Sequence, residues 1–460
     1  MALPQGFIRL HLLTALVMGV FHAQPAFSAT EQRLEGAVHW SGEVVMESAL
    51  RVPPTAELSL QPGTVVRIEK PDAAWKIEGR LRIQGTADNP VRFETVAGWQ
   101  GITVEQGAPP AEIHHAHFSS AETALLLRGA EALVNQAVFR SCTLALKAVR
   151  ESKLNVLENR FLNNGVGIDL ELKSRAVIRD TVFSGHGDAA LKAANHSVVH
   201  IESCRFSENR QGVLGMRKFP GVLRENRFVG NGQAVVCQRS GEGPALSGNH
   251  FEDNDEALVS TTFSRPQLSD NRFVHNRTAI TGDQFAGGVF QYNLFEKNDS
   301  ALRLTRRASP LVNYNIFRDN DVALFCDLGS YPLVRDNNFL GNPLAIKLGP
   351  LQSAAGALPQ GAMVGGERAP ERAPERQMAP QQNGPLAGQD YVDARDNWWG
   401  AATKALRSPE SSEQPTIFFD RDDYAAVDYG EGMVGAGGPV DRVLYDPWRM
   451  APVNDAGPRW

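Results

Sequence analysis

The sequence predicts an all-β chain that winds into a solenoid of short strands, and three observations support this fold class. A phenylalanine returns every 21 to 23 residues through the middle of the chain. Between these aromatics, short apolar segments alternate with polar positions, which is the period of β-strands. Asn, Asp and Gly separate the segments and mark turns. The repeating aromatics are Phe118, Phe139, Phe161, Phe183, Phe206, Phe228, Phe251, Phe273, Phe295, Phe317 and Phe339.

Aligning the repeats on this phenylalanine shows which positions face the core. An apolar residue lies five positions before it in nearly every repeat, and a small residue, usually Ala, lies six positions after it. A leucine-rich repeat has a similar period, but it requires L-x-x-L-x-L-x-x-N and usually a helical return limb. The intervals here contain no helix-length apolar stripe. The pattern therefore predicts a right-handed parallel β-helix, a single-stranded solenoid with coils of about 22 residues.

An Asn lies on each side of the repeating phenylalanine, in the pattern N-x-F-x-x-N. Because each coil of a parallel stack lies about 4.8 Å above the last, amides in one column can hydrogen-bond as a ladder and satisfy turn backbone groups. Asn also tolerates the left-handed backbone that a sharp corner needs. We interpret the motif as structural. The earlier site holds Asn226, Asn249, Asn271, Asn293, Asn315 and Asn337, and the later site holds Asn209, Asn231, Asn254, Asn276, Asn298, Asn320 and Asn342.

The first 28 residues have the pattern of a signal peptide. Arg9 is their only charge, an apolar run covers residues 10–21, and small residues precede a cleavage site after Ser28. The run is too short to span a bilayer, and no later stretch is apolar enough to cross one. We therefore predict a signal peptide over residues 1–28, no membrane span, and a protein that is periplasmic or secreted.

The rest of the chain divides by composition. We predict the β-helix with its N-terminal cap over residues 29–350. Residues 351–389 include "GERAPERAPERQMAPQQNGP", which is rich in Pro, Gln and Ala and has little to bury, so we predict a disordered insertion there. In "ARDNWWG", Asn397 precedes Trp399 by two residues and resumes the repeat. Residues 390–460 are predicted to form the last coil and a C-terminal cap, with "YDPW" packing back onto it.

The charge balance excludes one class of partner. The 460 residues include 46 Lys and Arg against 52 Asp and Glu, which gives a net charge of −6. No block of like charge is long enough to act as a nucleic-acid arm. We expect no nucleic-acid partner.

Several motifs resemble one known family. "GTVVRIE", "GRLRIQGTADNPVRF", "GWQGI", the N-x-F coils, "DNWWG" and "YDPW" resemble the extracytoplasmic right-handed parallel β-helix repeat family, from Leu58 to about Trp448. This group includes pectate-lyase-like carbohydrate enzymes and the periplasmic copper-binding accessory protein of nitrous oxide reductase. The resemblance implies the fold and an extracytoplasmic compartment. Because members do different things on one scaffold, it leaves a polysaccharide lyase or hydrolase and a copper-handling accessory protein as alternatives.

Catalytic residues are not evident in the repeat register. "SGHGDAA" places His186 and Asp188 between small residues, in the manner of the Gly-His-Gly segment of glycan-cleaving enzymes. However, His186 falls at the later ladder position, and glycosidic chemistry needs two carboxylates at a defined separation. The preceding coils supply no such pair. We assign no catalytic residue and lean towards a protein that is not an enzyme.

Two groups of residues are candidates for a metal, although a protein without a cofactor is the preferred interpretation. Asp255, Asp299 and Asp321 share a column of acidic turns that could hold Ca²⁺, but solvated acidic turns are commoner. His115 and His117 point to one face and could hold Cu²⁺ or Zn²⁺ if a neighbouring coil supplied another ligand. Neither set is a complete ligand shell.

The register argues against disulfides among the four cysteines, although an even count in an exported protein would favour them. Cys237 and Cys326 share a column but lie four coils apart, and Cys142 and Cys204 replace ladder Asn residues at different corners. A separation of several coils far exceeds disulfide reach. We predict four buried free thiols.

One surface column is basic on an otherwise acidic protein. The residue before the repeating phenylalanine should face outward, and four successive coils place Arg205, Arg227, His250 and Arg272 there. Such a row could bind an acidic polysaccharide or the acidic face of a protein partner. Glu225 and Asp270, two residues earlier on their strands, are expected to neutralise it in part. We therefore predict an exported, non-enzymatic β-helix that binds a glycan or protein partner on its solenoid face.

Overall fold

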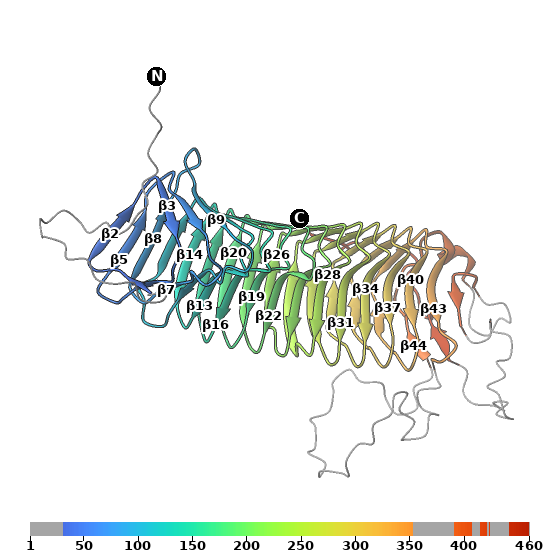
Figure 1. The fold of residues 1–460 in the computed structure, drawn as a ribbon. Coiled ribbons are helices and arrows are strands. Elements are labelled where there is room, and N and C mark those ends of the chain that lie inside the picture. Colours follow the sequence, from blue (N-terminus) through green and yellow to red (C-terminus); the bar gives the residue numbers. More distant parts are fainter. Residues whose placement is uncertain (1–30, 353–390, 407–414, 421–422, 424–440, 460) are drawn as a thin grey trace, which may run out of the picture. The chain divides into compact units, whose positions relative to one another are not determined.

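The structure is a computed structural model that describes residues 31–352, 391–406, 415–420, 423 and 441–459 (Figure 1). The predicted signal peptide and nearly all of the predicted insertion at 351–389 lie outside the described residues. The chain forms two compact units, residues 1–221 and 222–460. Successive coils contribute one strand to each of three parallel sheets, here called sheets A, B and C, and only sheets A and B continue beyond β42 (Asn338–Leu340). The predicted all-β parallel solenoid is confirmed.

In the first unit, neighbouring strands of a sheet come from successive coils. Sheet A contains β1 (Gln32–Arg33), β4 (Leu50–Val52), β7 (Trp75–Ile77), β10 (Ile102–Val104), β13 (Thr123–Arg128), β16 (Leu144–Val149), β19 (Val166–Leu170), β22 (Ala189–Ala194) and β25 (Gln211–Met216). Sheet B contains β2 (Ala37–Trp40), β5 (Glu57–Leu60), β8 (Arg80–Gln84), β11 (Ala111–His114), β14 (Glu131–Asn135), β17 (Lys153–Leu157), β20 (Arg175–Arg179) and β23 (Val198–Glu202). Sheet C contains β3 (Glu43–Met46), β6 (Val65–Ile68), β9 (Val91–Thr95), β12 (Ala116–Ser119), β15 (Val138–Arg140), β18 (Arg160–Leu162), β21 (Val182–Ser184) and β24 (Arg205–Ser207).

The second unit repeats this arrangement, and Figure 1 shows the strands of its sheet A side by side. Sheet A contains β28 (Gln233–Gln238), β31 (Glu256–Thr261), β34 (Thr278–Asp283), β37 (Ser300–Leu304), β40 (Val322–Cys326), β43 (Leu344–Leu348) and β45 (Phe418–Phe419). Sheet B contains β26 (Val222–Arg224), β29 (Glu242–Ser247), β32 (Arg265–Ser269), β35 (Val289–Gln291), β38 (Leu311–Asn313), β41 (Leu333–Arg335), β44 (Tyr391–Asp393) and β46 (Arg442–Leu444). Sheet C contains β27 (Arg227–Val229), β30 (His250–Glu252), β33 (Arg272–Val274), β36 (Leu294–Glu296), β39 (Ile316–Arg318) and β42 (Asn338–Leu340). The short helix η2 (Gly400–Ala405) follows the last core tryptophan.

The repeating phenylalanines stack along the core of sheet C. In the second unit the rings from Phe228 to Phe339 lie 4.7 to 5.0 Å apart and nearly parallel. In the first unit the stack from Phe93 to Phe206 has spacings of 4.5 to 4.9 Å. One ring from each coil therefore fills the same core position, because the backbone register repeats.

The asparagine ladders are confirmed in the second unit. From Asn226 to Asn337, the Nδ2 atom of each earlier-site Asn donates to the Oδ1 atom of the next at 2.9 to 3.0 Å. The later site forms the same chain from Asn231 to Asn342. Each Oδ1 atom also accepts the backbone N–H of the preceding ladder Asn, as Asn293 does from Asn271 at 3.0 Å. The amides therefore satisfy corner backbone groups that the strands leave unpaired.

The expectation that the ladder Asn residues adopt left-handed backbone is wrong. The residue before each one does so instead: Asp270, before Asn271, has a φ of 59°, and Tyr292, before Asn293, has a φ of 57°. The left-handed residue makes the corner and turns the following Asn side chain inward, where it is buried. The Asn amide therefore supplies hydrogen bonds to the corner, and the residue before it adopts the left-handed φ.

The repeat resumes after the undescribed segment, in the frame that the sequence predicted. The amide Nδ2 of Asn337 donates to Oδ1 of Asn397 at 3.0 Å, and Trp399 stacks on Phe339 with ring centres 4.6 Å apart. Tyr445 then packs on Phe418 at 5.0 Å and on Trp448 at 5.9 Å. Residues that are 60 apart in sequence therefore occupy adjacent rungs of the same ladder.

Candidate functional site

The basic column predicted from the sequence exists in the second unit. Arg227, His250 and Arg272 are paired in register on β27, β30 and β33. Arg227 is exposed and the other two are half-buried. Arg205 begins β24 in the first unit and is also exposed. In the second unit, backbone pairing therefore fixes the spacing of three outward basic side chains.

The carboxylate that neutralises part of this column is not one of those expected. Arg227 Nη2 lies 2.6 Å from Glu252 Oε2, and His250 Nε2 lies 3.5 Å from the same oxygen. Glu225 instead pairs with Arg224 at 2.9 Å, and Asp270 binds the guanidinium of Arg459 at 2.9 Å. The expectation for Glu225 and Asp270 is wrong because both occupy left-handed corner positions. Glu252, by contrast, projects from a strand of sheet C beside the column.

The three basic groups differ in their electrostatic state. The hydrogen bond from Arg227 holds the pKa of Glu252 below its usual value, so this carboxylate stays charged. Burial lowers the pKa of His250, and Arg227 and Arg272 lower it further against the opposing effect of Glu252. The side chain of Arg272 forms no ion pair within the described part of the chain, and its buried Nε has no hydrogen-bond partner there. Among the three basic residues of this column in the second unit, Arg272 therefore has no ion pair and a buried, unsatisfied Nε within the described residues.

The same outward column changes from basic to uncharged residues beyond Arg272. Its next members are Leu294, Ile316 and Asn338, in register on β36, β39 and β42. The C-terminal segment of residues 449–459, here called the tail, covers them. Asn338 Nδ2 donates to the Val453 carbonyl at 3.0 Å, and its Oδ1 accepts the Val453 N–H at 2.9 Å. The apolar Leu294 and Ile316 at outward positions were the sequence signal for this cover, which sequence reasoning missed.

The tail ends beside the basic column. The Gly457 N–H donates to the Tyr314 carbonyl at 2.8 Å. Arg459 then makes two side-chain hydrogen bonds to Asp270, at 2.9 and 3.0 Å, and its guanidinium lies 3.7 Å from the centre of the Tyr292 ring. These contacts reach three successive corners of the second unit, at Tyr314, Tyr292 and Asp270. Within the described residues, none of these tail contacts involves Arg227, His250 or Arg272.

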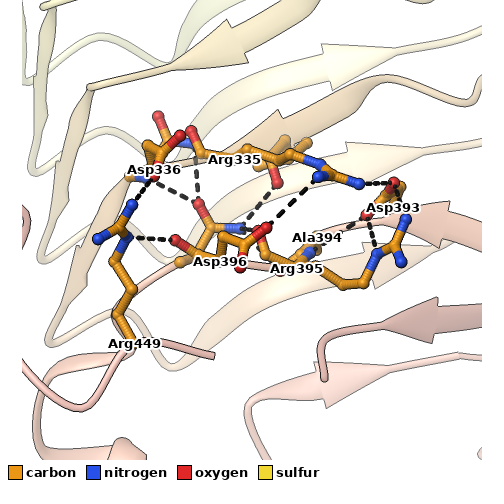
Figure 2. Close-up of polar contacts among 10 residues, drawn as sticks. Arg335, Asp336, Asp393, Ala394, Arg395, Asp396 and Arg449 are labelled. Atoms are coloured by element: carbon orange, nitrogen blue, oxygen red, sulfur yellow. Dashed lines mark hydrogen bonds and ion pairs between the residues drawn. The ribbon is translucent and has the colours of Figure 1, made fainter. Parts of the chain in front are cut away.

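A second polar cluster joins the strands on either side of the undescribed segment (Figure 2). Asp393 accepts hydrogen bonds from Arg335 at 2.6 Å and from Arg395 at 2.9 Å. Burial opposes ionisation of Asp393, but these hydrogen bonds lower its pKa to about 2. Arg449 binds Asp336 and donates to the Asp396 carbonyl at 3.0 Å. Each carboxylate in this cluster already has a cationic partner, so we interpret the cluster as a structural tie.

The histidine pair predicted as a metal site has unfavourable surroundings for a cation. His115 occupies a left-handed corner with a φ of 46°, and His117 lies on β12 opposite Arg92 of β9. Burial lowers the pKa of His117, and Arg92, Arg140 and His115 lower it further. Within the described ranges no group of three or more His, Cys, Asp or Glu side chains could hold a metal ion. The residues present do not fit a copper or zinc centre.

The acidic turns proposed for Ca²⁺ have a similar difficulty. Arg277 lies between Asp255 and Asp299 in the same column, and its Nε lies 3.5 Å from Asp255 Oδ1. A guanidinium therefore already occupies the position that a calcium ion would share with this carboxylate.

His186 has the ladder role that its position indicated. It is buried, and its Nδ1 lies 2.8 Å from Asn209 Oδ1 while its Nε2 lies 3.4 Å from Asn164 Nδ2. Burial lowers its pKa to about 4. A Cβ added to Gly167 would lie 2.9 Å from Nε2, so this glycine gives the imidazole its space. Asp188 is paired with Lys192 and Arg210 instead of with His186.

All four cysteines are free and buried, as predicted. Cys237 and Cys326 are separated in register by Ser260, Gly282 and Leu304, which confirms the four-coil spacing. Burial raises the pKa of Cys142 to about 11 and that of Cys237 to about 12. Burial therefore keeps all four thiols protonated at neutral pH.

The coils, ladders and stacked rings define a parallel β-helix. A family model described as "Right handed beta helix region" matches residues 100–257, 174–301 and 221–356, which together cover more than half of the 460 residues. The chain belongs to the right-handed β-helix family. No curated protein matches the chain. Among the described residues there is no helix with the length and apolar character needed to cross a membrane.

Proposed function

We propose that this protein is an exported, non-enzymatic β-helix that binds an acidic polysaccharide, or the acidic surface of a protein partner, on the outer face of β27, β30 and β33. The single observation that carries the proposal is the in-register column of Arg227, His250 and Arg272, in which Arg272 has no ion pair among the described residues. A partly desolvated cation without a partner favours a bound anion.

The geometry favours an extended anion over a small one. Consecutive coils place the basic groups about 4.8 Å apart along the solenoid axis, and backbone pairing holds this spacing rigid. A polymer carrying regularly spaced carboxylates can contact more than one of them at once. Glu252 moderates the attraction, because an incoming carboxylate has to compete with it for Arg227.

The direction of the pKa shifts gives the pH dependence. His250 is neutral at pH 7 because burial and its arginine neighbours lower its pKa. Its protonation adds a third positive charge to the column and requires a lower pH than an ordinary imidazole does. Binding of a polyanion should therefore strengthen as the pH falls, provided that the ligand stays ionised.

Export is part of the proposal and rests on the signal-peptide pattern of residues 1–28. A periplasmic or secreted location would place the column where acidic polysaccharides occur. Fusion of residues 1–28 to a reporter enzyme, with fractionation of the cells, tests this part. Reporter activity that stays in the cytoplasm would contradict it.

The binding test uses polygalacturonate as the probe and the double variant Arg227→Glu/Arg272→Glu. The parent should bind with an affinity that falls steeply as salt rises, and the double variant should lose at least tenfold. Arg277→Glu/Lys297→Glu makes the same charge change at exposed corner positions and is the matched control. Salt-insensitive binding, or equal losses in both double variants, would show that the column is not the site.

A further inference from the structure

A pair of phenylalanines lies outside the core of the second unit. Phe263 follows β31 and Phe285 follows β34, at equivalent corners of successive coils. Their rings stack with centres 5.0 Å apart and planes within 8°, and they are 50% and 40% exposed. The guanidinium of Arg307 lies 5.6 Å from the centre of the Phe285 ring. We call Phe263 and Phe285 the corner aromatic pair.

The corner does not itself require aromatic side chains. Phe263 and Phe285 have φ values of 61° and 62°, and the next two residues of their column, Arg307 and Gly329, adopt the same left-handed backbone at 65° and 75°. The two rings stay half exposed, so folding buries only part of their apolar surface. An exposed aromatic pair that neither the core nor the corner backbone requires has the character of a binding feature.

The corner aromatic pair begins abruptly, because the preceding turn is one residue shorter. Cys237, Ser260 and Gly282 are paired in register, and the backbone N–H of Ser240 donates to the Ser264 hydroxyl at 3.0 Å. Three positions separate Cys237 from Ser240, whereas four separate Ser260 from Ser264. The missing position is the one that Phe263 occupies. The face of Phe263 towards β28 therefore has no ring stacked on it from that coil.

The groups around this open face favour a protein ligand over a glycan. A sugar site needs several convergent polar groups, but the Thr262 hydroxyl already donates to Gln284 Oε1 at 2.8 Å. Arg239 is exposed in the short turn and forms no ion pair with any described residue. Exposed aromatic rings beside arginines are typical of the energetically dominant residues of protein interfaces.

We propose that this corner docks a partner protein by accepting one of its aromatic side chains onto the open face of Phe263. The inserted ring takes the position that the short turn leaves out and continues the ladder. Acidic residues beside that ring pair with Arg239. This site uses a corner between sheets A and B and does not depend on the basic column of sheet C.

The test measures binding of the full chain to two labelled peptides by fluorescence anisotropy. One peptide is acetyl-Asp-Asp-Phe-Asp-Asp-amide, and the other has Ala in place of Phe. The Phe peptide should bind the parent at least tenfold more tightly than the Ala peptide. Phe263→Ala should remove this tenfold preference, and Arg239→Glu should weaken binding of the Phe peptide at least fivefold.

A variant with one additional Phe between Arg239 and Ser240 supplies the missing ring within the chain. It should stay folded and lose binding of the Phe peptide at least tenfold. Leu172→Ala, which removes a 48% exposed apolar side chain at a left-handed corner of the first unit, is the matched control and should change nothing. Arg227→Glu/Arg272→Glu should also bind the peptide normally, which separates this proposal from the proposed function.

Equal affinities for the Phe and Ala peptides would overturn the proposal. Undiminished binding by Phe263→Ala would do the same. Binding of cellohexaose that depends on Phe263, without any preference for the Phe peptide, would assign the corner to a glycan and refute the protein ligand.

Discussion

Replacing Asn271 with Ala tests whether the earlier asparagine ladder stabilises the second unit. Asn271 is fully buried in the middle of the ladder. Its Oδ1 accepts from the backbone N and the Nδ2 of Asn249 at 3.0 and 2.9 Å. Its Nδ2 donates to the Leu246 carbonyl at 3.0 Å and to Asn293 Oδ1 at 2.9 Å. The substitution removes all four hydrogen bonds, and the Ala side chain has no donor or acceptor to replace them.

The expected magnitude follows from the partners that are left behind. Asn293 Oδ1 still accepts from the backbone N of residue 271 at 3.0 Å. The Asn249 backbone N–H, one Asn249 amide hydrogen and the Leu246 carbonyl lose their bonds to Asn271. Each orphaned buried group costs about 1–3 kcal/mol. Because local relaxation recovers part of this, we expect the free energy of unfolding to fall by about 3–5 kcal/mol.

Urea unfolding followed by far-UV circular dichroism measures the loss, and hydrogen exchange locates it, because repeat arrays can open locally. Amides of residues 246–293 should exchange faster than those of distant coils. Asn313→Ala is the control, since the buried Oδ1 of Asn313 has no hydrogen-bond partner in the described structure. It should change stability by less than about 0.5 kcal/mol. If Asn271→Ala unfolded at the same urea concentration as this control, the ladder would contribute no net stability.

Two further predictions concern the ladder histidine and the tail. The folded pKa of His186, about 4, lies below its ordinary value of 6.5, so stability is full above pH 6.5 and is lost as the pH falls towards 4. The loss of stability should reach about 3 kcal/mol. Thermal melting at pH 7 and pH 4 should show that His186→Asn reduces this loss. An unchanged acid sensitivity of the variant would place the cause elsewhere. In Gly457→Ala, the added Cβ would lie 2.6 Å from Ile316 Cδ1 at a φ of 94°. This variant should release the tail and increase hydrogen exchange at the Val453 amide, whereas Met450→Ala, at a 77% exposed position, should not; full protection in Gly457→Ala would refute the tight fit.

Column arguments from the sequence succeeded wherever residues in one column contact each other directly. The Asn271–Asn293 hydrogen bond and the Phe273–Phe295 stack could both be read from a spacing of 22 residues. The physical reason is that parallel in-register pairing places equivalent residues of successive coils one above another. The same reasoning separated Cys237 from Cys326 correctly.

The ion-pair partners of side chains at the corners could not be derived from the repeat spacing. The sequence identified Arg227 and Arg272 as outward residues, but it assigned their neutralisation to Glu225 and Asp270. In the structure Glu252 pairs with Arg227, and Arg272 has no ion pair among the described residues, because ion pairing depends on the directions in which corner and strand side chains project. The left-handed residue before each ladder Asn was also missed, because the spacing of the repeat does not show which corner residue adopts the positive φ.

The sequence by itself determined the coil length, the core column and the ladders, because each depends on contacts one period apart, and it determined the free thiols because the same period keeps the cysteines several coils apart. Only the tertiary structure decided where the tail runs and what it covers. Arg459 binds Asp270 across a sequence separation of 189 residues, and Val453 binds Asn338 across 115. Neither separation is a feature of the repeat, since the tail crosses the coils instead of joining them. Its path depends on the fit of Gly457 against Ile316 and on the pairing of Arg459 with Asp270, and both require the folded surface to exist first.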